Sequence, residues 1–389
     1  MIFWISILFS AIYFFTLILF LSGLSFPKKP VSTAAPFISV IIPIKNELVN
    51  LAQLLQHLRE QNYPEDKHEI IFVDDCSDDG SGDYLREHIR DCNNMHVLSM
   101  LGVQSDYIFK KAPLNHGIRN SRGEIIMITD ADCVMGPEWM STVAAYFNTS
   151  TAMVAGFSGQ TRDGSFFDRF QALDFLMLMA GTQGSMNLGL PWGCSGQNLA
   201  FRRSGFEAVG GFAPLKDYVA GDDSLFMQLI YRHNLGKITF AADARAWVQN
   251  EPVDRLSIFV RQRIRWATDA NYMLSLNVPF FIVLLAAFMA NLAPIAFLLG
   301  AVFFSVPLWQ FLVLVGVKLI GEGMLCRRAT AVYDRKVLRK IFLPWFLIQM
   351  PYTVFMGVAS FFGKRMGWGT KKGLTSSDTA VKIPERRNQ

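Results

Sequence analysis

Gly123-Glu-Ile-Ile-Met-Ile-Thr-Asp130-Ala-Asp132 decides the fold, because a short apolar run within it ends at two carboxylates. The mainly apolar residues at 125–129 predict a strand that is buried on both faces. Runs 37–43 and 69–74 have the same form, and stretches with helical spacing lie between the three runs, at 51–58, 81–89 and 115–121. This alternation predicts an α/β fold, in which helices cover both faces of a mostly parallel sheet.

Carboxylates follow two of these strands. Asp75 comes directly after 69–74, and Asp130 and Asp132 follow 125–129. Ligands of such sheets bind beyond the carboxyl ends of the strands, so we expect the three side chains to face one ligand. Asp130 and Asp132 can hold a divalent cation that bridges a diphosphate, and Asp75 can accept hydrogen bonds from a nucleobase or ribose. Three neighbours are expected only to begin the helix 81–89: Asp78, Asp79 and Ser81.

Two familiar nucleotide sites are disfavoured. The first strand is followed by Pro43-Ile-Lys-Asn46-Glu47 where a dinucleotide site would have Gly-x-Gly-x-x-Gly, and the chain has no P-loop motif.

Asp222 and Asp223 stand just before an apolar-periodic stretch, 225–231. A carboxylate within hydrogen-bond reach of an acceptor hydroxyl can take its proton, so Asp223 is a candidate general base. On local evidence alone, the pair could equally be an ordinary helix cap. The stretch 189–198, which contains Gln197, is a candidate wall of the acceptor site or a tight packing turn.

Gln262, Arg265 and Trp266 are spaced i, i+3 and i+4, so they share one face of a helix. Arg265 can donate paired hydrogen bonds to a departing diphosphate, and Trp266 can offer its ring to an acceptor sugar. Arg261 and Arg263 are expected to face lipid headgroups.

Hydrophobic residues make up 51% of the 389, which indicates a membrane part. Residues 1–24 carry no charge, and Lys28 and Lys29 follow them, which favours a retained anchor with its C-terminal side in the cytoplasm over a cleaved signal peptide. Three more apolar blocks lie at 278–306, 308–326 and 341–363. Basic clusters flank the last block on both sides, so we expect a re-entrant, interfacial or doubled element in this region.

The net charge of +5 is modest, and the basic residues lie near the apolar blocks. Anionic headgroups and diphosphates are therefore better partners than nucleic acid. The five cysteines are scattered without a Cys-x-x-Cys pair, which favours reduced thiols and argues against a disulfide framework or a structural zinc site.

Seven motifs resemble family 2 glycosyltransferases in their order along residues 37–270. They begin with Ile-Ser-Val-Ile-Ile-Pro43-x-x-Asn46-Glu47, Val-Asp74-Asp75-x-Ser, Lys110-x-x-x-Leu114-Asn115-x-Gly117 and Gly123-Glu-Ile-Ile-x-x-x-Asp130-Ala-Asp132. They continue with Gly196-Gln-Asn198-x-Ala200-Phe201-Arg202, Phe206-Glu-x-Val-Gly-Gly-Phe212 and Gln262-x-x-Arg265-Trp266. The last motif is similar to the membrane-bound branch, which includes cellulose, chitin and hyaluronan synthases and ceramide glucosyltransferases.

The resemblance implies a GT-A (Rossmann-like) nucleotide-sugar domain, a divalent cation (Mg²⁺ or Mn²⁺) and inversion at the anomeric carbon. It implies donor-binding roles for Pro43, Asn46, Glu47, Asp75, Lys110, Asp130, Gln262 and Arg265. It implies metal ligation by Asp130 and Asp132, catalysis by Asp223 and Arg265, and acceptor binding by Gln197, Asp222 and Trp266. Asp222 departs from the family pattern, which has glutamate there. Trp368-Gly369-Thr370-Lys371 is similar to a gating loop of chitin and hyaluronan synthases, with a disordered basic tail as the alternative.

The expected organisation is an anchor at 1–24, a catalytic domain at 37–250, interfacial helices at 251–277, a membrane region at 278–363 and a basic cytoplasmic tail at 364–389. The expected function is transfer of a sugar from a UDP-sugar to a lipid or lipid-linked acceptor at the cytoplasmic face of the membrane. The alternatives are a processive polysaccharide synthase and a non-catalytic nucleotide-binding scaffold. A nucleotidyltransferase would leave the Gln262 motif without a purpose.

Overall fold

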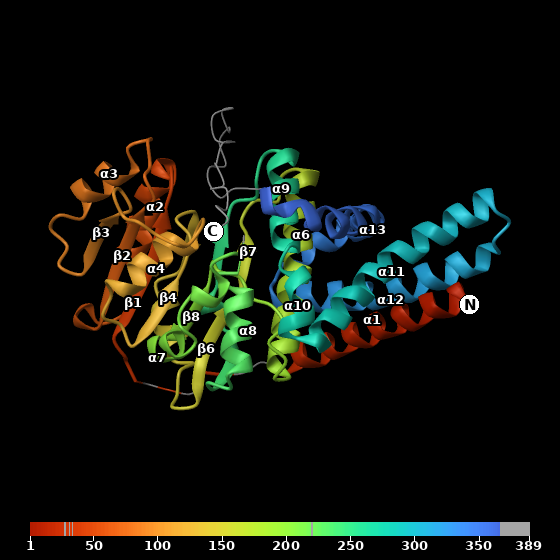
Figure 1. Ribbon diagram of the computed structural model, residues 1–389, viewed down its shortest axis with the longest axis horizontal. Coiled ribbons are helices and arrows are strands. Elements are labelled where there is room, and N and C mark those ends of the chain that lie inside the picture. Colours follow the sequence, from red (N-terminus) through yellow and green to blue (C-terminus); the bar gives the residue numbers. More distant parts are fainter. Residues whose placement is uncertain (27–28, 31, 33, 219–220, 366–389) are drawn as a thin grey trace, which may run out of the picture.

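The computed structural model describes residues 1–26, 29–30, 32, 34–218 and 221–365 (Figure 1). Its main sheet has seven strands in the order β3-β2-β1-β4-β8-β6-β9. The bounds of these strands are β1 Ile38–Ile44, β2 His68–Asp74, β3 Met95–Ser99, β4 Ile125–Ile128, β6 Thr151–Gly156, β8 Leu199–Arg202 and β9 Lys237–Ala241. Only β8 runs antiparallel to its neighbours, β4 and β6. The predicted α/β class and the mostly parallel sheet are confirmed.

The strands of the sheet alternate between two cores. Val40, Ile42 and Phe72 pack against one group of helices, whereas Ile41 and Val73 face the other group. The first face is covered by α2 Leu48–Arg59, α3 Ser81–His88 and α5 Trp139–Ala144. The second face is covered by α4 Lys111–Arg119, α6 Phe166–Asn187, α7 Arg203–Ala208 and α8 Ser224–Arg232. The helix predicted at 115–121 begins four residues earlier, as α4.

A small second sheet lies beside the predicted metal site. It has the order β5-β10-β7, with bounds β5 Cys133–Met135, β7 Ser158–Gln160 and β10 Val248–Asn250. Because β5 begins directly after Asp132, this sheet fixes the backbone on the far side of the two carboxylates.

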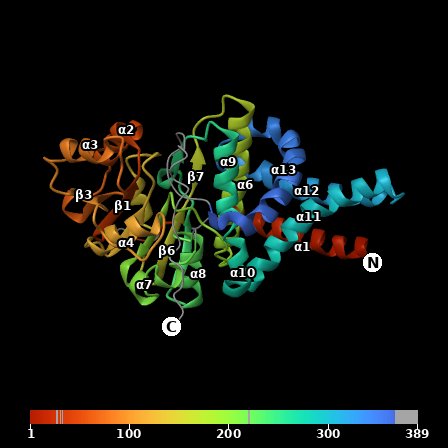
Figure 2. The ribbon, with the colours of Figure 1, turned by 45° about the horizontal axis from the view of Figure 1, so that its top comes forward.

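Four helices of the described part are long and apolar enough to cross a membrane, which confirms one N-terminal and three C-terminal membrane segments. Their bounds are α1 Ile2–Ser25, α11 Val278–Phe303, α12 Leu308–Val332 and α13 Phe342–Ala359, the last preceded by the 3₁₀ helix Lys336–Ile341. In Figure 1, α1, α11 and α12 run side by side away from the sheet. Between them and the sheet stand α6 and the shorter helices α9 Leu256–Ala267 and α10 Ala270–Leu276, as Figure 2 shows from another side.

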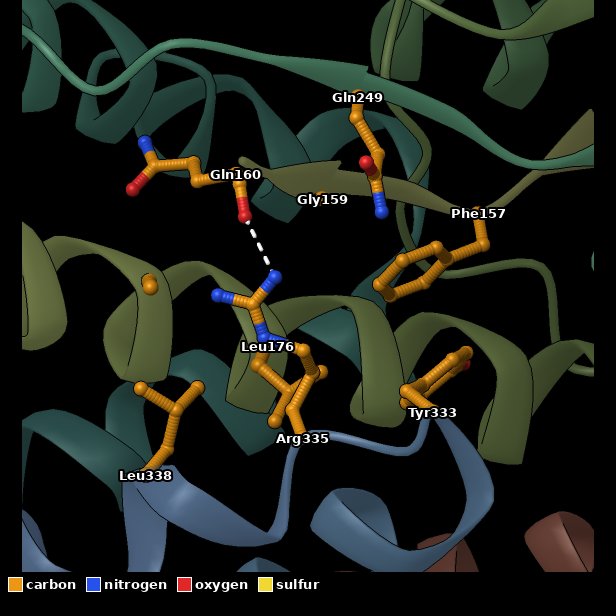
Figure 3. A pocket seen from close by; sticks show the side chains of 9 residues that line it. Phe157, Gly159, Gln160, Leu176, Gln249, Tyr333, Arg335 and Leu338 are labelled. Carbon is orange, nitrogen blue, oxygen red and sulfur yellow. Dashed lines mark hydrogen bonds between the residues drawn. The ribbon is translucent and has the colours of Figure 1, made fainter. Parts of the chain in front are cut away.

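Residues near both ends of α13 form hydrogen bonds with other parts of the chain. Before it, Arg335 donates a hydrogen bond of 2.8 Å to the carbonyl of Gln160 on β7 (Figure 3). After it, Ser360 and Asn271 of α10 are joined by a hydrogen bond of 3.3 Å. The re-entrant, interfacial or doubled element expected in this region stays a prediction. The crevice beside Arg335 has a volume of about 20 Å³, enough for about one water molecule.

Candidate active site

The loops after β1 and β2 hold each other. Lys45 forms an ion pair of 3.3 Å with Asp75, and the Oδ1 atom of Asn46 accepts a hydrogen bond of 2.9 Å from the backbone of Asp78. Asn46 is in the left-handed region, at φ 57°. Burial raises the pKa of Asp75, although Lys45 acts in the opposite direction. Asp75 and Asn46 therefore lie together at the carboxyl edge of the sheet, where the sequence predicts the donor nucleotide.

Lys110 connects the two acidic motifs. Its Nζ atom lies 2.5 Å from Asp130 and 3.8 Å from Asp222, and its side chain is only 10% exposed. Burial alone would lower the pKa of Lys110, but Asp130 and Asp222 raise it, so the ammonium stays charged. Burial, then Asp132 and Asp222, raises the pKa of Asp130, against the effect of Lys110. The motifs that contain Asp130 and Asp222 are far apart in the sequence, but both lie next to the buried ammonium group of Lys110.

Asp223 lies at the start of α8, with both carboxylate oxygens oriented by backbone groups. Gly196 donates a hydrogen bond of 3.1 Å to Oδ2, and Ser224 donates one of 2.5 Å to Oδ1. Burial and the neighbouring Asp222 raise the pKa of Asp223 to about 6. The cap and the catalytic interpretations are therefore compatible, because a helix-capping carboxylate also faces the acidic cluster.

Gly221 sets the direction of this pair. Its φ of 103° lies in the left-handed region, and a Cβ atom built there would come within 2.7 Å of Leu225. Only glycine adopts this turn without strain.

Arg265 on α9 belongs to the same neighbourhood, because its charge acts on Asp269, which in turn lies near Asp222 and Asp223. Within the described chain, no ion pair or hydrogen bond fixes the side chain of Arg265 or of Gln262. A partly buried guanidinium without a fixed partner can bind an anionic ligand.

The expectation that Arg263 faces lipid headgroups is wrong. Arg263 is buried and forms an ion pair of 3.2 Å with Asp174 of α6. It lies one turn after the buried Phe259 and shares that face of the helix, whereas Arg261 is exposed. The guanidinium is 4.1 Å from the ring centroid of Trp266. Arg263 therefore joins α9 to α6 and covers one face of Trp266.

The loop 189–198 divides between packing and the site. Trp192 is a packing residue, because it is buried and stacks on Phe280 of α11 with the ring planes 3° apart. Gln197 differs, because its Oε1 atom is buried without a hydrogen-bond partner among the described residues. Gln197 lies next to Gly196, which binds Asp223, so it stays a candidate acceptor-binding residue.

Asp269 was missed by the sequence reasoning. Burial, then Asp223 and Asp222, raises the pKa of its carboxyl group, and Arg265 acts in the opposite direction. A signal was present, because Asp269 follows Arg265 by four residues, the spacing of about one helical turn.

The residues fit a divalent cation that is shared with a ligand. Among the described residues, no group of three acidic, histidine or cysteine side chains could hold a metal alone. Mg²⁺ and similar cations commonly bind one or two carboxylates together with substrate phosphates and water, which Asp130 and Asp132 can provide. Trp368-Gly369-Thr370-Lys371 lies outside the described residues.

This fold, with its strand-end carboxylates, defines a GT-A glycosyltransferase. Residues 2–379 match the profile of glycosyl transferase family 21, and the chain belongs to that family, which shares a clan with family 2. The chain is thus a glycosyltransferase, as predicted.

Two curated relatives are the probable glycosyltransferase YdaM of Bacillus subtilis and the beta-monoglucosyldiacylglycerol synthase of Nostoc sp. The first is 30% identical over 253 residues, or 61% of this chain and 56% of the relative. The second is 24% identical over 243 residues, or 62% of this chain and 50% of the relative. The chain spans about half the length of these curated relatives.

The fold is also similar to a solved mannosyltransferase from Pyrobaculum calidifontis in complex with GDP-Man and Mn²⁺. The TM-score is 0.60 at 19% identity, and the match covers 93% of this chain and 99% of the other. This likeness concerns the fold alone.

Proposed function

We propose that this protein is a membrane-bound inverting glycosyltransferase that transfers a sugar from a UDP-sugar to a lipid or lipid-linked acceptor at the cytoplasmic face. The observation that carries the proposal is the convergence of Asp130, Asp222 and Asp223 around Lys110, next to an arginine without a fixed partner on α9. The first of the three C-terminal apolar helices, α11, begins soon after Arg265 in the chain, so we place the site next to the membrane part.

In the proposed reaction, an acceptor hydroxyl attacks the anomeric carbon of the donor sugar, and the bond between the sugar and the nucleoside diphosphate breaks. Asp223 takes the hydroxyl proton, because its carboxylate is already held by Gly196 and Ser224. Arg265 donates hydrogen bonds to the leaving diphosphate, where negative charge accumulates. Asp130 and Asp132 would hold Mg²⁺ or Mn²⁺, which neutralises that diphosphate.

The other predicted donor residues are proposed to bind the rest of the nucleotide-sugar. Asp75, on the loop after β2, would accept hydrogen bonds from the nucleobase or ribose. Pro43 near the end of β1, and Asn46 and Glu47 in the loop after it, would bind the donor beside Asp75. Lys110, between Asp130 and Asp222, would contact the donor phosphates. Gln262 lies one turn before Arg265 and would contact the same leaving group.

The acceptor is proposed to approach from the helices next to the membrane. Asp222, Gln197 and Trp266 are its proposed contacts, and the exposed Arg261 faces anionic headgroups.

The test measures transfer of radiolabelled sugar by membranes that contain the protein. UDP-glucose, UDP-N-acetylglucosamine and GDP-mannose are offered separately, each with Mg²⁺ or Mn²⁺, and the lipid fraction is analysed by mass spectrometry. A new glycolipid, lost in Asp223→Asn and Asp132→Asn, is the expected result. Unchanged transfer in both variants would defeat the proposal, and a long water-soluble polymer would favour the processive synthase.

A further inference from the structure

Asp269 lies at the junction of α9 and α10, and one of its oxygens has no partner. The Oδ1 atom is buried without a hydrogen bond in the described chain. Asp269 occupies the N-cap position of α10, where an aspartate usually accepts a backbone hydrogen bond, but its side chain makes no such bond. Buried polar atoms nearly always have a hydrogen-bond partner, so we expect this oxygen to bind a group from outside the chain.

The surroundings of Asp269 belong to the proposed acceptor side. Charged groups from three other segments act on it: Asp223 and Asp222 at α8, Arg265 on α9, and Lys111 on α4. The thiol of Cys194, in the loop that contains Gln197, is also influenced by the three carboxylates together. The Asp269 carboxyl and the proposed base therefore lie in one neighbourhood.

An aromatic pair lies near Asp269 in the chain. Tyr272, one turn after Asp269, stacks on Tyr218 with a centroid distance of 4.1 Å and an interplanar angle of 20°. Lys111 donates a hydrogen bond to the carbonyl of Tyr218, which fixes that segment to α4. Carboxyl groups beside an aromatic wall suit a ligand that is polar at one end and apolar at the other.

The nature of the missing partner follows from charge. The described residues hold no cluster that could bind a metal here. The charged groups that act on Asp269 are two carboxylates, Asp222 and Asp223, and two cations, Arg265 and Lys111, so its surroundings carry no net charge. A neutral hydroxyl, which can both donate and accept, fits this balanced setting.

We propose that Asp269 is an acceptor-binding residue, which hydrogen-bonds a second polar group of the acceptor, of hydroxyl type, beside the hydroxyl that Asp223 deprotonates. This inference rests on the proposed function. It implies that the acceptor headgroup carries at least two hydroxyl-type groups close together, as in a polyol, a sugar or an amino-alcohol amide.

The test separates acceptor binding from donor chemistry. Detergent-purified protein receives the donor found above, and two rates are measured: hydrolysis of the donor by water without lipid, and transfer at graded concentrations of a total membrane lipid extract. The variants are Asp269→Leu, which keeps the branched shape of the side chain but removes its oxygens, and Asp269→Asn. Asp91→Asn is a control, because Asp91 follows α3 and its side chain is 90% exposed.

In Asp269→Leu we expect the half-saturating lipid concentration to rise about tenfold, the effect of about one lost hydrogen bond, while donor hydrolysis stays within about twofold. Asp269→Asn should shift it about threefold, and Asp91→Asn should leave it unchanged. An unchanged half-saturation in Asp269→Leu, or an equal fall in both rates, would overturn the inference.

If Asp269→Leu shows no thermal unfolding transition, Asp269→Asn decides by the same two rates. Failure of the proposed function looks different, because the native protein would then transfer no sugar to any lipid in the extract.

Discussion

At the scale of single residues, the raised pKa of Asp223 has a direct consequence for activity. A general base works only when ionised, and a pKa of about 6 means that the ionised fraction falls about tenfold for each pH unit below 6. We therefore expect kcat to be level near pH 8 and to decline below about pH 6, measured as sugar transfer at saturating donor. Asp223→Asn should lower kcat at least about 100-fold at every pH. A rate that stays level from pH 7 to pH 5 would contradict this assignment.

A second prediction at this scale concerns Gly221. Alanine at this position must adopt a positive φ and also meet Leu225, whereas Gly102 has a similar φ of 77° with open space around it. Both Gly221→Ala and Gly102→Ala should cost about 1–2 kcal/mol of backbone strain. Only Gly221→Ala should also lower transfer markedly, because it redirects Asp222 and Asp223. Equal activity in the two variants would show that this turn does not orient the carboxylates.

The sequence could predict that Asp75, Asp130 and Asp132 follow strands at one edge of the sheet, because carboxylates after buried strands have a simple geometric meaning. It could not place Arg263 correctly, because an arginine on an apolar helix face is understood only when its partner, Asp174 on another helix, is known. Asp269 was missed for a related reason, since its role depends on Asp222 and Asp223, which are distant in the chain.

At the scale of helices and strands, local patterns predicted β1, β2 and β4 and the four apolar helices well. The small sheet and α6 were not predicted. Strands of three residues, such as β5 and β10, carry too little pattern, and they form only because β10 returns to the end of the metal-site loop. Most of α6 is buried on several sides, so it shows little amphipathic periodicity.

The contact between α1 and α6 gives a prediction at this scale. Gly23 and Gly184 let the two helices touch, and a Cβ atom on Gly184 would lie 2.5 Å from the carbonyl oxygen of Phe20. Gly184→Ala should therefore destabilise the protein by about 1–3 kcal/mol, measured as thermal unfolding in detergent. Gly316→Ala is a matched control, because this glycine of α12 has nothing within 4 Å of an added Cβ. Equal stability of the two variants would contradict the close packing of α1 on α6.

At the scale of the whole molecule, the apolar core is continuous from the sheet into the helices next to the membrane. One buried cluster includes Ile126 of β4, Phe170 of α6, Phe259 of α9 and Phe346 of α13. The catalytic part and the membrane part therefore share one hydrophobic core, which supports the site. Movement of α13 would also displace α9, since the ring of Tyr352 stacks on that of Phe259 with an angle of 23° between the ring planes.

A buried polar network joins the N-terminal helix α1 to the C-terminal helices α12 and α13. Lys318 of α12 donates hydrogen bonds of 2.6 and 2.7 Å to Glu322 and one of 2.7 Å to Gln349 of α13. Glu322 also accepts a hydrogen bond of 2.7 Å from Tyr13 of α1. The N-terminal helix and two C-terminal helices thus meet at one fully paired lysine.

Removal of one member of this network should harm the protein more than removal of both charges. Glu322→Leu leaves the ammonium of Lys318 buried without its counterion, which should cost about 3–5 kcal/mol of unfolding free energy in detergent. The double variant Lys318→Met/Glu322→Leu should recover most of this loss, because no uncompensated charge remains. Sugar transfer should follow stability in both cases, since neither residue lies at the site. A double variant that is less stable than Glu322→Leu alone would mean that the hydrogen bonds to Tyr13 and Gln349, and not charge compensation, join the three helices.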